Sequence, residues 1–205
     1  MLQERRVVLA SGNAGKLAEL RPLLAGFDLQ LETQDAFGLT SAAETATTFV
    51  GNALLKAQHA ADATGLAALA DDSGLIVDAL DGAPGVRSAR FAGDDADDAR
   101  NNRLLLERLA GVSDRSARFC CVLVLLRGPD DPLPLIATGT WEGRIAEAPR
   151  GVAGFGYDPL FVDPASGRAA AELSREDKAA RSHRGVAVRA LLAALEQARP
   201  LAARP

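Results

Sequence analysis

The fold class of this 205-residue chain is decided near its start, by the segments RVVLA (6–10), SGNAGK (11–16) and LAELRPLL (17–24). The first segment is short, apolar and bounded by glycine, which is typical of a buried strand. The third has leucines at helical spacing. A strand, a glycine loop and a helix in this order direct free backbone N–H groups and the positive end of a helix dipole towards an anion. An α/β fold with a candidate phosphate site is therefore predicted, although ordinary strand-to-helix turns have the same pattern.

The glycine loop does not match the known nucleotide-binding fingerprints. Its glycines are too close together for a Walker A loop, and Leu17 follows Lys16 where Ser or Thr would hold magnesium. It is not a dinucleotide fingerprint either. Any phosphate binding would rest on the local N–H groups and on the charge of Lys16.

Strand-like and helical segments alternate along the rest of the chain, which supports the α/β class. We expect a mixed sheet, because a short turn over 129–134 joins two strands. The chain is predicted to be a single domain over 1–205, with a frayed tail over 199–205. The expected apolar or strand segments are 6–10, 27–31, 66–70, 75–79, 119–126 and 135–141, and the expected helical segments are 17–24, 48–63, 101–109, 169–180 and 186–197.

Composition limits the classes of function. Hydrophobic residues make up 48% and charged residues 24% of the chain, as in an ordinary soluble protein, and the net charge of −4 argues against nucleic-acid binding. No stretch is apolar enough to span a membrane, and the N-terminus does not resemble a signal peptide, so we expect a cytoplasmic protein. The adjacent Cys120 and Cys121 are expected to be reduced core residues.

Three further segments carry candidate chemistry. Asp71-Asp72-Ser73-Gly74 follows an apolar run, and its carboxylates suit Mg²⁺, although a polar hairpin turn gives the same pattern. Lys56 shares a helix face with Asn52 and either reaches a phosphate or is solvated. His183 and Arg184 lie near a helix start, one or two turns after Lys178.

The segment Phe155-Gly156-Tyr157-Asp158-Pro159 holds two aromatic side chains, among them the only Tyr, in a chain with 4% aromatic residues. One interpretation is a ring-binding loop, in which an aromatic face stacks on a flat ligand and Asp158 accepts hydrogen bonds from its edge. The other is a tight turn whose aromatic side chains fill a core.

Four motifs in this order and spacing resemble the inosine triphosphate pyrophosphatase family, the RdgB/HAM1-like noncanonical purine NTP pyrophosphatases. They are Ser11–Lys16, Ala70–Leu75, Gly154–Pro159 and Ser182–Gly185, and the resemblance extends from about Arg6 to Leu195. It implies an elongated mixed α/β fold with two lobes around a nucleotide cleft. It also implies hydrolysis of dITP, ITP and XTP to the monophosphate and pyrophosphate with Mg²⁺, by a homodimer.

The resemblance also implies roles for single residues. Asp72 is the expected catalytic carboxylate and metal ligand, with Glu44 as a second metal ligand. The expected substrate-binding residues are Ser11, Gly12, Asn13, Ala14, Gly15, Lys16 and Lys56 for the triphosphate, Ser73 beside them, Phe155, Gly156, Tyr157 and Asp158 around the purine, and Lys178, His183 and Arg184 at its edge.

One departure from the family pattern concerns the metal site. The family commonly has Glu where this chain has Gly51, which removes a candidate carboxylate. Two other functions stay open: a Maf-like pyrophosphatase for pyrimidine nucleotides, and a noncatalytic nucleotide-sensing or RNA-binding module.

Overall fold

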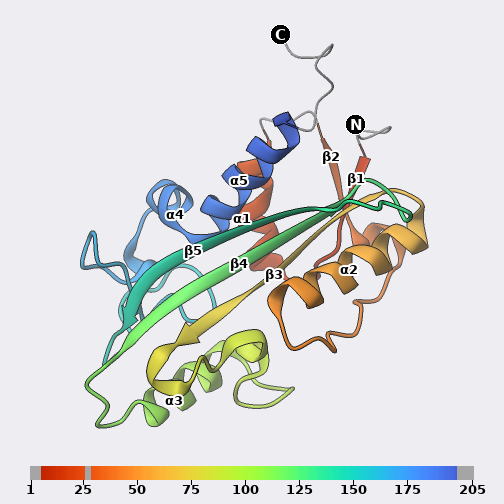
Figure 1. Ribbon diagram of the computed structural model, residues 1–205. Helices are drawn as coiled ribbons and strands as arrows, with labels where there is room; N and C mark the ends of the chain where they lie inside the picture. The colour runs from red at the N-terminus through yellow and green to blue at the C-terminus, as the bar shows by residue number, and fades with distance from the viewer. Residues whose placement is uncertain (1–5, 26–28, 198–205) are drawn as a thin grey trace. The chain divides into compact units, whose positions relative to one another are not determined.

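A computed structural model describes residues 6–25 and 29–197 (Figure 1). The tail over 199–205, for which fraying is predicted, lies outside the described residues, as do residues 27 and 28 of the second expected strand. None of the helices in the described part of the chain has the length and apolar character needed to cross a membrane.

Six strands form one sheet in the order β2-β1-β3-β4-β5-β6. β1 is parallel to β2 and to β3, whereas β5 is antiparallel to β6, so the predicted mixed sheet is confirmed. β4 and β5 are neighbours joined by residues 127–134, as the predicted turn requires. The strands are β1 (Arg6–Leu9), β2 (Gln30–Thr33), β3 (Ala67–Val77), β4 (Ser116–Leu126), β5 (Leu135–Ile145) and β6 (Phe161–Val162).

The expected break at residues 71–74 is wrong, because β3 runs through them without interruption. Two adjacent carboxylates usually disfavour a buried strand, but successive side chains of a strand point to opposite faces of the sheet. Asp71 and Asp72 therefore do not share an environment. Each is buried beside cations of its own, which removes the reason to expect a turn.

The helices begin and end at local signals. Asn13 caps α1 by accepting a hydrogen bond from the backbone N–H of Lys16, and Thr48 caps α2 in the same way. The helix expected over 169–180 is divided into a short 3-10 turn and α4, because Ser174 caps a new helix. The helices are α1 (Ala14–Leu24), α2 (Phe49–Thr64), α3 (Asp98–Arg108), α4 (Arg175–Arg181) and α5 (His183–Gln197).

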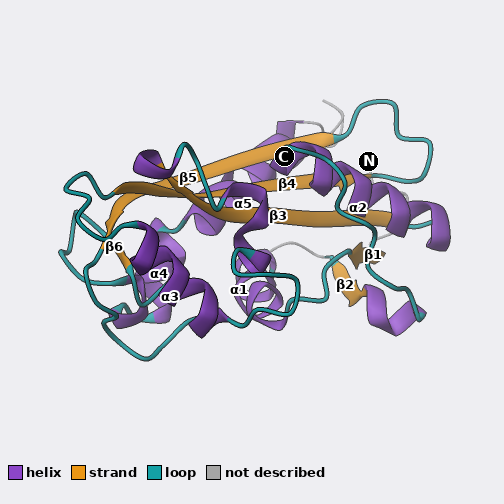
Figure 2. Cartoon of the chain, turned by 90° about the horizontal axis from the view of Figure 1, so that it is seen from below, coloured by secondary structure: helices purple, strands orange, loops and turns teal. Residues whose placement is uncertain are grey.

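The chain forms two compact units, and β3, β4 and β5 contribute residues to both. These three long strands are neighbours in the sheet (Figure 2). Unit 1 comprises residues up to Asp72, Cys121–Gly139 and the chain from Arg184. Its aliphatic core joins α1 and α5 to the sheet. The buried members of this core are Val7, Leu9, Leu20, Leu24, Ala67, Leu69, Cys121, Leu123, Leu125, Ala137, Ala187, Val188 and Leu191.

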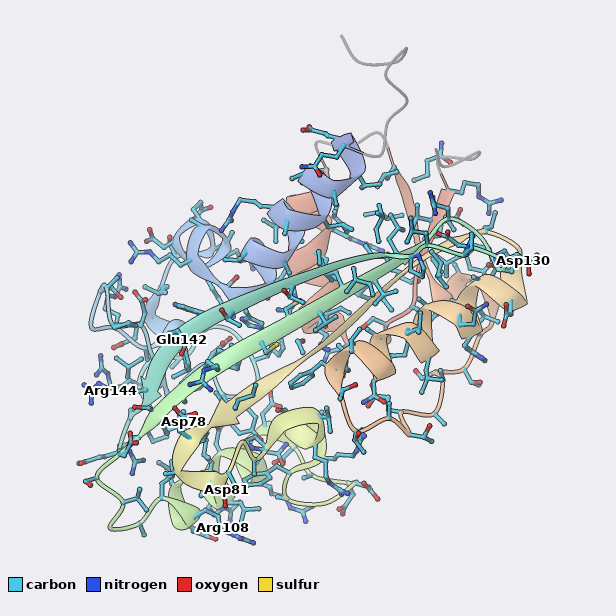
Figure 3. All side chains as sticks on the ribbon, viewed as in Figure 1. Asp78, Asp81, Arg108, Asp130, Glu142 and Arg144 are labelled. Atoms are coloured by element: carbon cyan, nitrogen blue, oxygen red, sulfur yellow. The ribbon has the colours of Figure 1, made fainter. Side chains whose placement is uncertain are left out.

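Unit 2 comprises Ser73–Cys120 and Thr140–His183, and its core is richer in aromatic side chains. Phe119 and Trp141 both pack against Phe161, with ring centroids 4.5 and 4.9 Å from it. On the surface of this unit, Arg118 of β4 donates to Asp78 at 2.9 Å and pairs with Glu142 of β5 at 3.0 Å. Asp78 and Glu142 are labelled in Figure 3. These exposed pairs link neighbouring chain segments but contribute little stability.

Candidate active site

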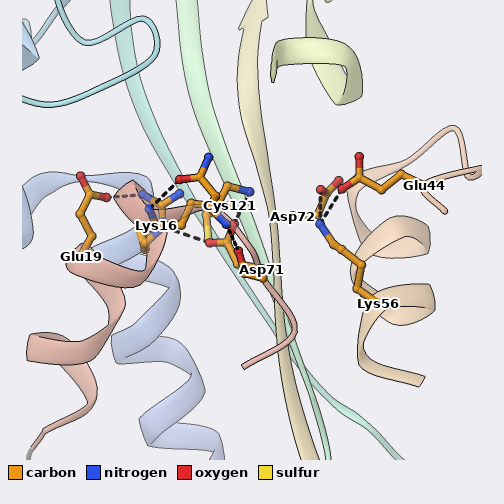
Figure 4. Close-up of polar contacts among 10 residues, drawn as sticks. Lys16, Glu19, Glu44, Lys56, Asp71, Asp72 and Cys121 are labelled. Atoms are coloured by element: carbon orange, nitrogen blue, oxygen red, sulfur yellow. Dashed lines mark hydrogen bonds and ion pairs between the residues drawn. The ribbon is translucent and has the colours of Figure 1, made fainter. Parts of the chain in front are cut away.

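Asp71 and Asp72 organise two separate clusters in unit 1, one on each face of β3 (Figure 4). On the first face, α1 and α5 supply cations to Asp71. Lys16 Nζ lies 2.7 Å from Asp71 Oδ1, and Arg184 Nε lies 3.0 Å from Oδ2. Cys121 Sγ donates to the same Oδ2 at 3.2 Å. The Asp71 cluster thus satisfies both carboxylate oxygens with protein groups.

The charges of the Asp71 cluster are buried and are paired with one another. Asp71 is 1% exposed and Arg184 is 2% exposed. Burial acts to raise the pKa of Asp71, but the charges of Arg184 and Lys16 outweigh it and hold that pKa well below its usual range. Burial raises the pKa of Cys121, and the Asp71 charge raises it further, so this thiol stays protonated. Arg184 also pairs with Glu19 of α1.

The Asp72 cluster lies on the other face and is formed with α2. Lys56 Nζ lies 2.7 Å from Asp72 Oδ1 and 2.9 Å from Glu44 Oε1, so one ammonium group joins the two carboxylates (Figure 4). Lys56 is 9% exposed, which excludes the solvated alternative. The structure therefore brings together the two residues predicted as metal ligands.

Asp72 differs from Asp71 in having a free oxygen. Among the described residues, no group forms a hydrogen bond to its buried Oδ2. Burial raises the pKa of Asp72, and Glu44 adds to this, while Lys56 opposes it without cancelling it. A carboxylate with one unpartnered oxygen and a raised pKa is suited to accept a proton from water or to bind a cation.

The donor set fits one hard cation that also binds substrate oxygens. In the part of the chain that the structure describes, no group of three or more His, Cys, Asp and Glu residues is placed to hold a metal ion. Mg²⁺ commonly takes only one or two carboxylates and completes its shell with water and phosphates. The unpartnered Asp72 Oδ2 and the nearby Glu44 meet that requirement.

Gly51 has a packing role in this chain. A Cβ atom at this position would lie 2.7 Å from the Cβ of Ala46 and 3.0 Å from Thr48 Oγ1. A glutamate at this position would therefore force the loop that carries Glu44 to move. Asn52, the next residue, is fully buried and accepts a hydrogen bond from the Ala46 N–H at 2.9 Å, which anchors this loop.

The predicted phosphate loop has the expected strand–loop–helix structure. Ser11 Oγ accepts a hydrogen bond from Asn13 N–H at 3.2 Å, and Asn13 Oδ1 accepts one from Lys16 N–H at 3.0 Å. Gly12, Asn13 and Ala14 are exposed, while Gly15 and Lys16 are partly buried. Ser73 follows Asp72 in β3 and is also partly buried.

The aromatic loop, residues 154–159, lies in unit 2, and its two aromatic side chains have different environments. Tyr157 is buried in the core and its hydroxyl donates to the Ser88 carbonyl at 2.8 Å. Burial and the Asp98 charge raise the pKa of Tyr157. Phe155 is only partly buried and is not a member of that core. Tyr157 thus follows the core-filling interpretation, whereas the stacking of Phe155 on a flat ligand stays a prediction.

Asp158 acts within the loop. Its Oδ2 accepts from the Phe155 N–H at 2.9 Å and from Lys178 Nζ at 2.5 Å, and the Lys178 ammonium lies 5.2 Å from the Phe155 ring centroid. A Cβ on Gly154 would lie 2.0 Å from this carboxylate, so only glycine fits there. Asp158 therefore holds Phe155 and Lys178 together, and its predicted contact with the edge of a ligand stays a prediction.

His183 and Arg184 form the first residues of α5, close to the predicted helix start. The His183 ring is buried and stacks on Phe119 of unit 2 at a centroid distance of 4.7 Å. Arg184 belongs to the Asp71 cluster of unit 1. Their predicted roles at the purine edge stay predictions.

Sequence reasoning missed Glu19 and the pairing of Asp71 with Arg184 and Cys121. Glu19 lies three residues after Lys16, so its place on the same face of α1 could have been read from helical spacing. The Asp71–Arg184 pair joins residues 113 positions apart, and no local pattern indicates it.

Comparisons with known proteins give one consistent result. The model of the Ham1 family matches residues 7–194. The chain is 56% identical over 193 residues to a protein from Shigella flexneri named dITP/XTP pyrophosphatase, covering 93% of this chain and 98% of that protein. A Yersinia pestis protein with the same name is 56% identical over 196 residues and is covered completely.

Solved structures show the same similarity. A HAM1 protein from Coxiella burnetii superposes with a TM-score of 0.88 at 50% identity, covering 94% of this chain and 99% of that one. The Staphylococcus aureus Ham1 protein gives a TM-score of 0.85 at 39% identity, covering 95% of this chain and all of that one.

Proposed function

Because the chain belongs to the Ham1 family, we propose that it hydrolyses dITP, ITP and XTP to the nucleoside monophosphate and pyrophosphate. The observation that carries the proposal is the Asp72 cluster. It combines a buried carboxylate with an unpartnered oxygen, a lysine and a second carboxylate. Hydrolysis of a phosphoanhydride needs such positioning and charge neutralisation more than it needs a covalent intermediate.

In the proposed mechanism, Asp72 Oδ2 accepts a proton from the attacking water. The water oxygen forms a bond to the α-phosphorus, and the bond to the bridging oxygen breaks, so that pyrophosphate leaves. Burial keeps the pKa of Asp72 above its usual value, which makes this carboxylate a better base than an exposed one. Lys56 holds the carboxylate in place through Oδ1, so Oδ2 is the oxygen proposed to serve both the water and, together with Glu44, the cation.

Asp72 and Glu44 would hold Mg²⁺. When bound, the ion would neutralise charge on the phosphate oxygens. The backbone N–H groups of Gly12, Ala14 and Gly15 and the ammonium group of Lys16 would bind the remaining phosphate oxygens, since they lie at the N-terminal end of α1.

The aromatic loop of unit 2 is proposed to bind the base. Phe155 offers a ring face outside the core, and Lys178 offers a donor beside that ring. The 6-oxo group of hypoxanthine or xanthine accepts a hydrogen bond, whereas the 6-amino group of adenine is itself a donor and cannot accept one from the Lys178 ammonium group. That mismatch costs about 1–3 kcal/mol, which supports discrimination against adenine.

The test is pyrophosphate release from dITP, XTP, dATP, dGTP and dTTP, with Mg²⁺ and with EDTA. We expect release from dITP and XTP only, and none in EDTA. Equal release from all five would contradict the assignment of the base, and release from dTTP alone would support a pyrimidine-directed enzyme. Orthophosphate as the first product would show that a different bond is cleaved.

We also propose that the protein is a homodimer and is located in the cytoplasm. Light scattering tests the homodimer.

A further inference from the structure

The geometry points to Asp98 and Asn102 of α3 as positioning residues for base binding, which hold Gly156 by both of its peptide groups and so fix Phe155. This inference rests on the proposed function in one respect, the stacking of Phe155 on the base. The residues involved all belong to unit 2. Neither Asp98 nor Asn102 belongs to a motif from which the site was predicted.

The contacts form a clamp on one residue of the aromatic loop. Asp98 Oδ2 accepts a hydrogen bond from the Gly156 N–H at 2.6 Å, and Asn102 Nδ2 donates one to the Gly156 carbonyl at 2.8 Å. Asp98 and Asn102 are four residues apart and therefore share one face of α3. The bond to Asp98 involves a charged acceptor, which makes it stronger than a bond between neutral groups.

The clamp adds to the other contacts of Phe155. Its ring is partly buried and is not a member of the apolar core of unit 2. Asp158 fixes the peptide group on its N-terminal side. Gly156, on its C-terminal side, has a φ of +61°, a conformation that glycine adopts without strain. The clamp from α3 fixes that second side.

The helix that supplies the clamp is itself rigidly placed. Leu105 and Leu109 at its C-terminal end are fully buried in the core. Asn101 is buried and bonds the backbone on both sides of the preceding turn, accepting from Ala92 N–H at 2.8 Å and donating to the Ala89 carbonyl at 3.1 Å. The clamp residues therefore take their position from a helix that is anchored in the core of unit 2.

Asp97 provides a matched control. It is adjacent to Asp98 and is also an exposed aspartate, but its side chain caps α3 by accepting from the Arg100 N–H at 2.7 Å. Asp97→Ala therefore removes a helix cap without removing a contact to the loop. Asp98→Asn keeps an acceptor for the Gly156 N–H and loses only the charge.

The kinetic experiment compares Asp98→Ala, Asp98→Asn, Asn102→Ala and Asp97→Ala with the wild type. We expect KM for dITP to rise about fivefold in Asp98→Ala and in Asn102→Ala, the scale of one lost hydrogen bond at a partly exposed site. Asp98→Asn should recover most of the loss. The inhibition constant of inorganic tripolyphosphate, which has no base, should not change. An equal rise in Asp97→Ala, or a parallel loss of tripolyphosphate affinity, would overturn the inference.

Hydrogen exchange of the Gly156 amide measures the clamp without any turnover. Exchange should be faster in Asp98→Ala than in the wild type and in Asp97→Ala. If the protein releases no pyrophosphate from dITP, the proposed function fails while this measurement still tests the clamp. Unchanged Gly156 exchange in Asp98→Ala, in a protein that is otherwise folded, would reject it.

Discussion

Asp71 and Asp72 are adjacent in one buried strand, yet their environments are opposite in kind. Asp71 uses both oxygens in bonds to Lys16, Arg184 and Cys121, and its pKa is lowered. Asp72 uses one oxygen, leaves the other without a partner in the described structure, and has a raised pKa. Burial is common to both and does not separate a structural carboxylate from a candidate catalytic one. The two carboxylates are distinguished by how many of their oxygens form hydrogen bonds within the protein.

The largest effect is expected for Asp72→Asn. The amide cannot accept a proton from water as a carboxylate does, so turnover of dITP should fall on the order of 1000-fold. The free energy of unfolding should stay the same or rise, because burial disfavours the charged form of Asp72. Pyrophosphate release and urea unfolding measure the two. A variant with near-wild-type turnover would remove Asp72 from the mechanism.

Asp71→Asn should have the opposite outcome, a large loss of stability. It leaves the buried Arg184 and the partly buried Lys16 without their shared counter-charge, which should cost about 3–5 kcal/mol. Because the folded-state pKa of Asp71 is lowered, its contribution is present above the unfolded pKa of about 3.9 and is lost as the pH falls through the folded value.

Urea unfolding of Asp71→Asn and the wild type at several pH values, in EDTA, measures this contribution. The two curves should approach each other only at acid pH. A constant difference over the whole range would show that Asp71 stabilises the protein by packing and not by charge.

Lys56→Met tests how the Asp72 cluster is tuned. The charge of Lys56 lowers the pKa of Asp72, so its removal should raise that pKa further and move the acid limb of the kcat/KM profile to higher pH. At neutral pH, turnover should fall about 10- to 100-fold, since the carboxylate loses the donor that holds its Oδ1 in place. Lys16→Met is the comparison, because Lys16 pairs directly with Asp71 and lowers the pKa of Asp72 only through its charge, so its shift should be the smaller one. An equal shift of the acid limb in both variants would show that the Asp71 and Asp72 clusters act as one electrostatic unit.

The smallest effect is expected for Cys121→Ala. It removes the thiol bond to Asp71 Oδ2, an oxygen that keeps its bond to Arg184. A stability loss of about 1 kcal/mol and unchanged turnover are expected, measured by urea unfolding and pyrophosphate release. A clear loss of turnover in a variant that is still folded would show that the Asp71 cluster contributes to catalysis.

Much of the fold could be predicted from local patterns. The first strand, the glycine loop and the first helix follow from residues 6–24, and the mixed sheet follows from the short connection between β4 and β5. The continuous β3 could not be predicted, because its carboxylates are tolerated only through ion pairs with α1, α2 and α5. Such ion pairs join residues far apart in the sequence, so local patterns do not indicate them.

The sequence by itself determined which residues belong to the motifs, since glycines, carboxylates and lysines at these spacings are local properties of the chain. Tertiary structure alone decided how the tasks are divided among them. The alternation of a strand sends Asp71 and Asp72 to opposite faces, and whichever helices cover those faces set the charge around each. Likewise, Tyr157 fills a core and Phe155 does not, because packing against distant strands selects one ring of the pair. Such choices depend on long-range burial and electrostatics, which no local pattern encodes.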